Sequence, residues 1–221
     1  MKKKHLWLAV VSLILLQNYA FCQSKPNLEK WGMNMGLNLP NWAKVPTGVT
    51  VKTVRNYGFD LSLIRRISLV KRLKLGIGLG LSNINIHNNV FHWEFDSAGQ
   101  VPSNVLLNKS DYRRNKISLT YLEIPIELSI RLGGEDKTTF RIAAGFNGGV
   151  LIDAHTKLVQ MNTTVKVKDT RNFNSWRYGP TLRLTVGKIG LYGRYDLSSS
   201  FDAKNVPDYP VYTIGVVFSG S

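Results

Sequence analysis

The chain has 221 residues, a formal net charge of +15 and 43% hydrophobic residues. This length fits one domain or one barrel, and the charge alone favours an anionic partner such as nucleic acid or a charged membrane surface. The N-terminal segment argues against nucleic acid, because it predicts export from the cytoplasm.

Residues 1–22 have the three-part layout of a secretory signal peptide. Three lysines come first, an apolar run from Leu6 to Leu16 follows, and a polar stretch with Ala20 leads to Cys22. The run is shorter than the roughly 20 residues that a transmembrane helix needs. We therefore predict a cleaved signal peptide over residues 1–22 and a barrel over residues 23–221.

Cys22 is the only cysteine, and it has two interpretations. It is either the acylated residue of a lipoprotein or the last residue before simple cleavage at Gln23. A lipobox has a small residue directly before the cysteine, whereas Phe21 stands there, so cleavage before Gln23 is favoured. The mature chain then contains no cysteine and forms no disulfide.

Eight blocks of period-two alternation follow, and this pattern is typical of barrel strands. The blocks are Trp31–Leu39, Tyr57–Ile64, Leu73–Leu81, a fourth that contains YLEIPIEL (121–128) and runs to Arg131, Phe140–Gly149, Trp176–Val186, Ile189–Ser198 and Val211–Phe218. The connections alternate between short (68–72, 133–138, 187–188) and long (40–56, 82–116, 150–175, 199–210). We therefore predict an all-β fold, an eight-stranded antiparallel up-and-down transmembrane β-barrel with tight turns and both termini on the periplasmic side.

Each block separates an apolar row from a polar row. The apolar row contains no Asp, Glu, Lys or Arg, and a Lys or Arg at a lipid-facing midplane costs about 2–4 kcal/mol. In a soluble barrel the large apolar side chains would have to fit inside, and eight strands leave too little room for them. We predict that the apolar row faces lipid, and that the polar row, which holds most of the strand glycines, faces a side-chain-filled lumen.

The polar row carries acids and bases together, which suggests an ionic ladder that plugs the lumen. Its predicted members are Asp60, Lys74, Glu123, Glu127, Arg141, Arg177, Arg183, Arg194 and Asp196. A buried carboxylate without a partner is too costly, so we expect Glu127 to pair with an arginine, Arg141 first. Pro125 cannot donate a ladder hydrogen bond and predicts a bulge or an unpaired position.

The stretch YLEIPIEL resembles the YLEIP strand motif of the PorT-like outer-membrane β-barrel proteins of Bacteroidota. The end of the signal peptide just before Gln23 and the glycine-rich LGIGLGLS strand are similar to that family too. The resemblance spans about Trp31 to Phe218 and implies an outer-membrane barrel of this type. PorT itself is implicated in type IX secretion, a role that this motif alone does not transfer.

A histidine-rich stretch in the second long connection raises the question of catalysis. INIHNNVFHWEFD contains His87, His92, Glu94 and Asp96, which form either a rim site for a metal or a reaction, or the wet face of a strand that continues above the membrane. No HExxH spacing is present, and no Ser, His and acid set can be assembled. We therefore predict no enzyme and no catalytic, metal or cofactor site.

Glu123 and Glu127 have a second interpretation, as a general acid and a general base. Four residues along one strand separate them by roughly 13–14 Å. They cannot share one substrate atom at that distance, so the ladder is favoured.

Basic residues gather in or beside the long connections and are the better functional lead. They are Lys44, Lys52, Arg55, Arg113, Arg114, Lys116, Lys157, Lys166, Lys168 and Arg171. Their expected neighbours are lipopolysaccharide phosphates, and the alternative is plain solubility. RRISLVKR places Arg65, Arg66, Lys71 and Arg72 at one periplasmic turn, where they meet lipid headgroups or dock a periplasmic partner.

These observations together favour an outer-membrane protein with a structural or interaction role. Its expected partners are outer-membrane lipid, lipopolysaccharide and a protein at the outer loops or periplasmic turns, with no nucleic acid. An accessory component of a secretion or transport machine is the first alternative. A small gated channel or a rim enzyme is the second.

Overall fold

A computed structural model describes residues 31–45, 47–92, 104–108, 110, 112–132, 140–161, 163–168, 173–201 and 208–220, with the backbone alone for 91–92 and 104–106. The predicted signal peptide at 1–22 and the predicted short turn at 133–138 lie outside these residues. Among them, no helix is long and apolar enough to cross a membrane.

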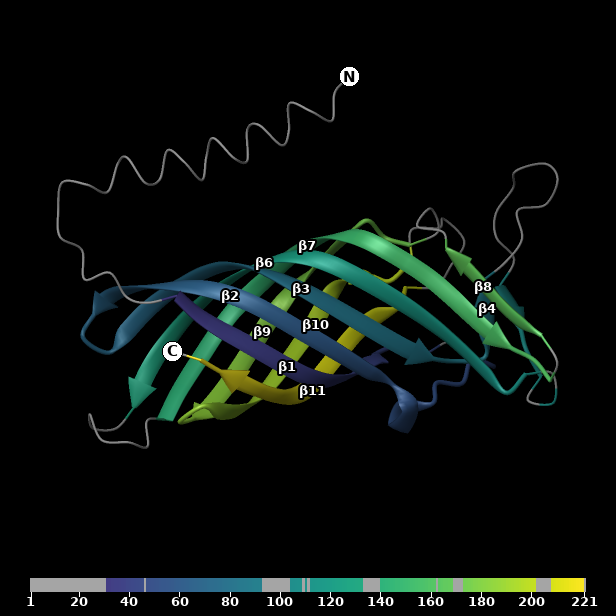
Figure 1. Ribbon diagram of the computed structural model, residues 1–221, viewed down its shortest axis with the longest axis horizontal. Helices are drawn as coiled ribbons and strands as arrows, with labels where there is room; N and C mark the ends of the chain where they lie inside the picture. The colour runs from purple at the N-terminus through teal and green to yellow at the C-terminus, as the bar shows by residue number, and fades with distance from the viewer. Residues whose placement is uncertain are drawn as a thin grey trace, which may run out of the picture.

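Eight long antiparallel strands close into a barrel (Figure 1). They are β1 (Trp31–Trp42), β2 (Tyr57–Val70), β3 (Leu73–His87), β6 (Arg114–Leu132), β7 (Phe140–Val159), β9 (Trp176–Val186), β10 (Ile189–Ser199) and β11 (Pro210–Ser219). Each strand pairs with its neighbours in chain order, and the β1–β11 ladder closes the ring. The predicted eight-stranded up-and-down barrel is confirmed.

Shorter elements lie at one end of the barrel. A short 3₁₀ helix, η1 (Thr53–Arg55), precedes β2, and β4 (Val90–His92) pairs with β5 (Asn104–Leu106). Strand β8 (Thr164–Lys168) extends the sheet beside β7. The opposite end carries the tight turns, including Gly187–Lys188, where Gly187 has the positive φ of 59° that a two-residue hairpin turn requires. The last described residue lies at the tight-turn end, where the Gly220 amide donates to the Met33 carbonyl.

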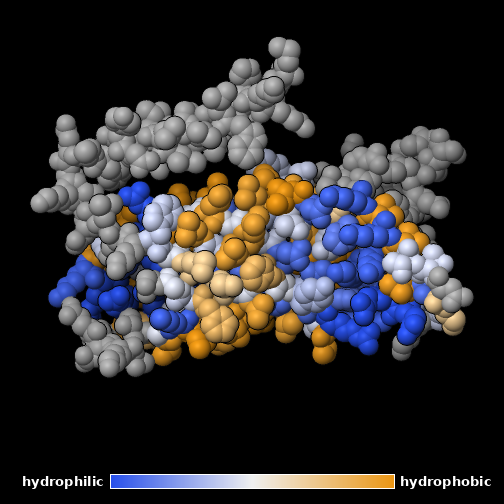
Figure 2. Space-filling view, viewed as in Figure 1, coloured by the Kyte–Doolittle hydropathy of each residue, from blue (hydrophilic) through white to orange (hydrophobic). Residues whose placement is uncertain are grey.

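Over the central section of the barrel, the apolar row faces outward and the polar row faces the lumen, as predicted. On β6, Ile124 and Ile126 are 52% and 47% exposed, whereas Glu123 and Glu127 point inward and are 4% and 7% exposed. Figure 2 shows the result on one face, an orange apolar band across the middle with blue polar residues at both ends. We call this central part the membrane section.

Several strands continue past the membrane section toward the long-loop end. Residues 82–87 belong to β3, 114–120 to β6 and 150–159 to β7, so the prediction of long loops over 82–116 and 150–175 is wrong for 82–87, 114–116 and 150–159. The inward row there is apolar, since Ile84 and Leu119 are each 2% exposed. The outward row holds Asn83, Asn85 and His87 instead. We call this part the outer extension. Sequence reasoning missed it because its apolar residues face inward, whereas the predicted strands all have apolar residues that face outward.

An apolar cluster fills the barrel at the level of the outer extension. Its members, which we call the cap, are Trp42, Ile84, Ile86, Ile117, Leu119, Tyr121, Ala154, Phe173, Phe201, Tyr209 and Val211. Ring centroids lie 4.7 Å apart for Trp42 and Tyr209 and 5.2 Å apart for Phe201 and Tyr209, within the range of favourable aromatic pairs. The cap is the soluble-type core of this protein.

The β6–β7 ladder changes register near the same level. Ile152 of β7 is the extra residue of a bulge opposite the step from Thr120 to Tyr121, at the border between the two sections. Pro125 causes no bulge, because its register with Asn147 on β7 runs on unchanged. Pairing with β3 is interrupted opposite Pro125 instead, which is the predicted unpaired position and follows from the missing N–H.

Candidate functional site: a closed lumen and a basic outer surface

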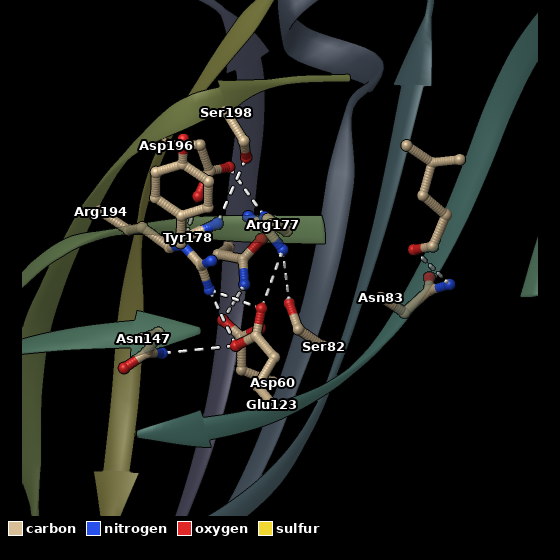
Figure 3. Close-up of polar contacts among 12 residues, drawn as sticks. Asp60, Ser82, Asn83, Glu123, Asn147, Arg177, Tyr178, Arg194, Asp196 and Ser198 are labelled. Carbon is tan, nitrogen blue, oxygen red and sulfur yellow. Dashed lines mark hydrogen bonds and ion pairs between the residues drawn. The ribbon is translucent and has the colours of Figure 1, made fainter. Parts of the chain in front are cut away.

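Four charged residues form a compact cluster in the upper lumen, just below the cap (Figure 3). Arg194 Nη1 donates to both carboxylate oxygens of Glu123, at 2.7 and 2.8 Å. Arg177 Nε donates to Asp196 Oδ2 at 2.8 Å, and Arg177 Nη1 lies 3.5 Å from Glu123 Oε1. Arg194 Nε also donates to Asp196. Each side chain is at least nine-tenths buried, so each charge depends on its partners.

Neutral groups complete the hydrogen bonding of this upper cluster. Arg177 Nη1 donates to Ser82 Oγ at 2.9 Å, and Asn147 Nδ2 donates to Glu123 Oε2 at 3.3 Å. Asp60, on β2, accepts a short hydrogen bond from Asn38 of β1. These bonds tie strands on opposite sides of the barrel to one network, which is what holding charge in a narrow lumen requires.

A second cluster lies closer to the tight-turn end and is centred on Glu127. Its carboxylate accepts hydrogen bonds from Arg183 and, at 3.4 Å, from Arg66. Arg66 Nη2 also donates to Asn34 Oδ1 at 3.4 Å. The prediction that placed Arg66 at a periplasmic turn is wrong, because β2 runs on to Val70 and turns this side chain into the lumen, where it is 4% exposed.

Arg141 does not take the position predicted for it. It lies opposite Arg131 in the β6–β7 ladder, near the tight-turn end, and is half-buried. The carboxylate of Glu127 is held instead by arginines from β2 and β9, which a single sequence could not rank above a direct neighbour. Lys74 lies on the same inward row of β3, opposite Ser129.

Glycines make the room that the two glutamates need. Gly76 lies opposite Glu127 on β3, and a Cβ atom there would stand 2.7 Å from Glu127 Cγ. Gly149 lies opposite Glu123 on β7, and its Cβ would stand 2.7 Å from Glu123 Cγ. Both distances are below a normal van der Waals contact, so the polar-row glycines are part of the ladder's packing.

Little open space remains in the lumen. A cavity of about 60 Å³ is lined by residues that include Asp60, Glu127, Arg183 and Tyr192. An enclosed water needs about 10–15 Å³ of such space, so this cavity has room for a few water molecules and not for a continuous conducting path. Above it the cap leaves a cavity of only about 10 Å³ beside Trp42 and Phe201.

The outside of the outer extension is basic. Its described cations include Lys52, Arg55, Arg114, Lys116, Lys157, Lys166 and Lys168. Lys44 and Arg113 are also exposed nearby, whereas Arg171 lies outside the described residues. Asp153 lies among them on β7 and is already engaged, with Lys168 Nζ at 2.8 Å and His155 Nδ1 at 3.3 Å. The hydrogen bond from Lys168 lowers the pKa of Asp153, so this carboxylate stays ionised.

The histidine-rich stretch can be followed only in part. His87 ends β3 on its outward row and is 7% exposed, while the side chains of His92, Glu94 and Asp96 lie outside the described part of the chain. Within that part, no group of three His, Cys, Asp or Glu residues could hold a metal ion. Sequence reasoning missed the surroundings of His87, because it treated 82–116 as a loop.

A family match supports the type of fold. A family described as "Outer membrane protein beta-barrel domain" matches residues 21–200. No curated protein matches the chain. Solved structures that resemble it include the attachment invasion locus protein Ail of Yersinia pestis (10% identity, TM-score 0.36, covering 86% of this chain and 97% of that one). Another is the translocator domain of autotransporter NalP from Neisseria meningitidis (8% identity, TM-score 0.26, covering 98% and 96%). Such low values assign no role to this chain.

Proposed function

The chain belongs to the outer membrane protein beta-barrel domain family, and on that premise we propose that it is a closed, non-conducting barrel with a structural or interaction role. It is neither an enzyme nor a wide pore. We further propose that residues 1–22 are removed on export and that the barrel is built from residues 23–221.

Double closure of the lumen is the observation that carries this proposal. The two ionic clusters fill the membrane section, and the aromatic cap seals the outer extension above them. A pore would need water along the whole axis, whereas the cavity beside Glu127 measures about 60 Å³ and the one in the cap about 10 Å³.

The outer extension is the part that the protein offers to its surroundings. It projects beyond the apolar band, its core is packed, and its outward face is basic. A rigid, charged projection on a closed barrel suits contact with lipopolysaccharide or with a protein partner. An accessory role in a secretion or transport machine is the second candidate, and it rests on the YLEIP motif on β6.

Planar bilayer recording tests the closed barrel directly. We expect the purified mature protein, shown to be folded by its heat-modifiable migration on gels, to give no steady conductance. A wide porin in the same bilayers is the positive control. Stable porin-sized openings from this protein would contradict the proposal. In that case, a pull-down from outer membranes in mild detergent would be used to identify transport partners.

A further inference from the structure

We propose that a hollow on the outside of the barrel wall, beside the ends of β3 and β6 in the outer extension, binds the phosphate group of an outer-leaflet glycolipid. The hollow measures about 350 Å³ and is lined by Arg55, Tyr57, His87, Arg114 and Lys116. These residues come from η1, β2, β3 and β6, so four elements converge on one site. This inference rests on the proposed outward-facing role and names a ligand for it.

The lining is suited to an anion. It contains two guanidinium groups and one ammonium group, and none of the five residues is acidic. Arginine forks match phosphate oxygens in a bidentate manner. Lys52 adds a fourth positive charge beside the hollow, with its Nζ atom 5.2 Å from the centre of the Tyr112 ring.

Lys116 is held in position for a ligand. Its Nζ atom donates to Tyr57 Oη at 3.0 Å and to Asn85 Oδ1 at 2.8 Å. These two described bonds use two of the three hydrogens that an ammonium group carries. Asn85 in turn donates to Asn83 at 2.6 Å, so a chain of polar side chains fixes the cation along the outward row.

His87 provides an independent sign of a missing partner. The side chain is 7% exposed, yet its Nδ1 atom is buried without a hydrogen bond within the described structure. Its backbone is fixed on both sides, since its amide donates to Asn56 Oδ1 at 2.7 Å and its carbonyl accepts from the Lys52 amide at 2.8 Å. A buried polar atom left without a partner costs free energy, and this one belongs to a ring that lines the hollow.

The depth of the hollow indicates a lipid and not a free anion. Tyr57 is outward-facing and 51% exposed, and Phe59 follows on the same row. Two residues along a strand span about 7 Å, so Tyr57 places the near edge of the hollow about that far from the apolar band at Phe59. Tyrosines at such borders sit at headgroup level, where lipid phosphates are concentrated.

Lipid binding by the purified full-length mature protein tests the site. Native mass spectrometry in neutral detergent compares a bis-phosphorylated lipid A with its dephosphorylated form, and inorganic phosphate forms a third arm. We expect retention of the phosphorylated lipid, and a loss of about tenfold or more in affinity for Arg114→Gln with Lys116→Gln, since removing one charge-assisted bond already approaches a tenfold effect.

The matched control is Lys71→Gln with Lys188→Gln. These two lysines are exposed in the tight turns at the opposite end of the barrel, carry the same charge and do not line the hollow. We expect the control to stay within about threefold of the wild type, as for a surface change away from the site. If the first pair does not give the folded gel band, Arg55→Gln replaces it, because Arg55 lies outside the barrel strands.

Three outcomes would overturn the proposal. They are equal losses for both pairs of substitutions, equal retention of the dephosphorylated lipid, and inorganic phosphate binding as tightly as the lipid. None of them bears on closure of the lumen, which bilayer recording reports separately. Steady conductance, conversely, would contradict the closed barrel and leave the lipid site standing.

Discussion

Strand β6 carries Leu119 and Ile126 on opposite sides of the barrel wall. Leu119 points into the cap and is 2% exposed, while Ile126 points away from the barrel and is 47% exposed. In the membrane section the solvent is lipid, so apolar side chains lie outside and charges pair inside. In the outer extension the solvent is water, and the arrangement is that of a soluble β-protein. The same strands therefore follow two opposite rules, and the border lies near the bulge opposite Thr120 and Tyr121.

Breaking the ionic cluster at Glu127 should have the largest effect. Glu127→Ala leaves Arg66 and Arg183 buried without their carboxylate, and loss of one partner of a buried pair costs about 3–5 kcal/mol. Urea unfolding in lipid vesicles measures this cost. Replacing Arg183 by Leu in the same chain should restore part of it, whereas replacing Arg141 should not. Rescue by Arg141 alone would contradict the pairing described for this cluster.

The cap should respond as a soluble core does. Leu119→Ala removes a fully buried side chain, for which the cost is about 2–5 kcal/mol. The matched change Ile126→Ala in the membrane section should cost less, because lipid chains fill the space that it leaves. Equal losses of unfolding free energy would remove the distinction between the two sections.

A positive charge on the outward row of β6 should destabilise the membrane section more than the border with the outer extension. Ile126→Arg brings a cation into lipid and should destabilise by about 2–4 kcal/mol. Thr120→Arg, on the same outward row but at the border with the outer extension, should change the unfolding free energy by less than about 1 kcal/mol. Both variants are compared by urea unfolding in vesicles. If Ile126→Arg proves harmless, the faces of β6 are assigned backwards.

A pH dependence of stability is expected from His87 in the outer extension. Burial, followed by the charges of Lys116, Arg114, Arg55 and Lys52, lowers the pKa of His87 to about 4 from its ordinary 6.5. The unfolded chain binds more protons than the folded chain between these values, so His87 makes stability fall as the pH drops from 6.5 to 4. His87→Gln should flatten the stability curve over that range. An unchanged slope would show that His87 titrates normally in the folded protein.

The eight strands and their facing could be predicted because period-two alternation is a local signal. Arg66 was missed since the apolar Ile64 stands on the inward row just before it, which ended the pattern too early. The cap was missed because Ile84 and Leu119 continue the strands with the rows exchanged. The partners of Glu127 depend on contacts across the barrel, between β6, β2 and β9, and no single sequence specifies these.

The exchange of rows along β6 is tested most directly by nitroxide scanning. Single cysteines are placed from 116 to 128 in the mature chain, which lacks Cys22 if cleavage occurs as proposed, and collisions with oxygen and with a water-soluble nickel chelate are measured in vesicles. We predict that labels at Ile124, Ile126 and Leu128 collide mainly with oxygen, and that labels at Lys116 and Ser118 collide mainly with the chelate. Oxygen-dominated collisions along the whole even-numbered row would contradict the account, because they would place the outer extension in lipid.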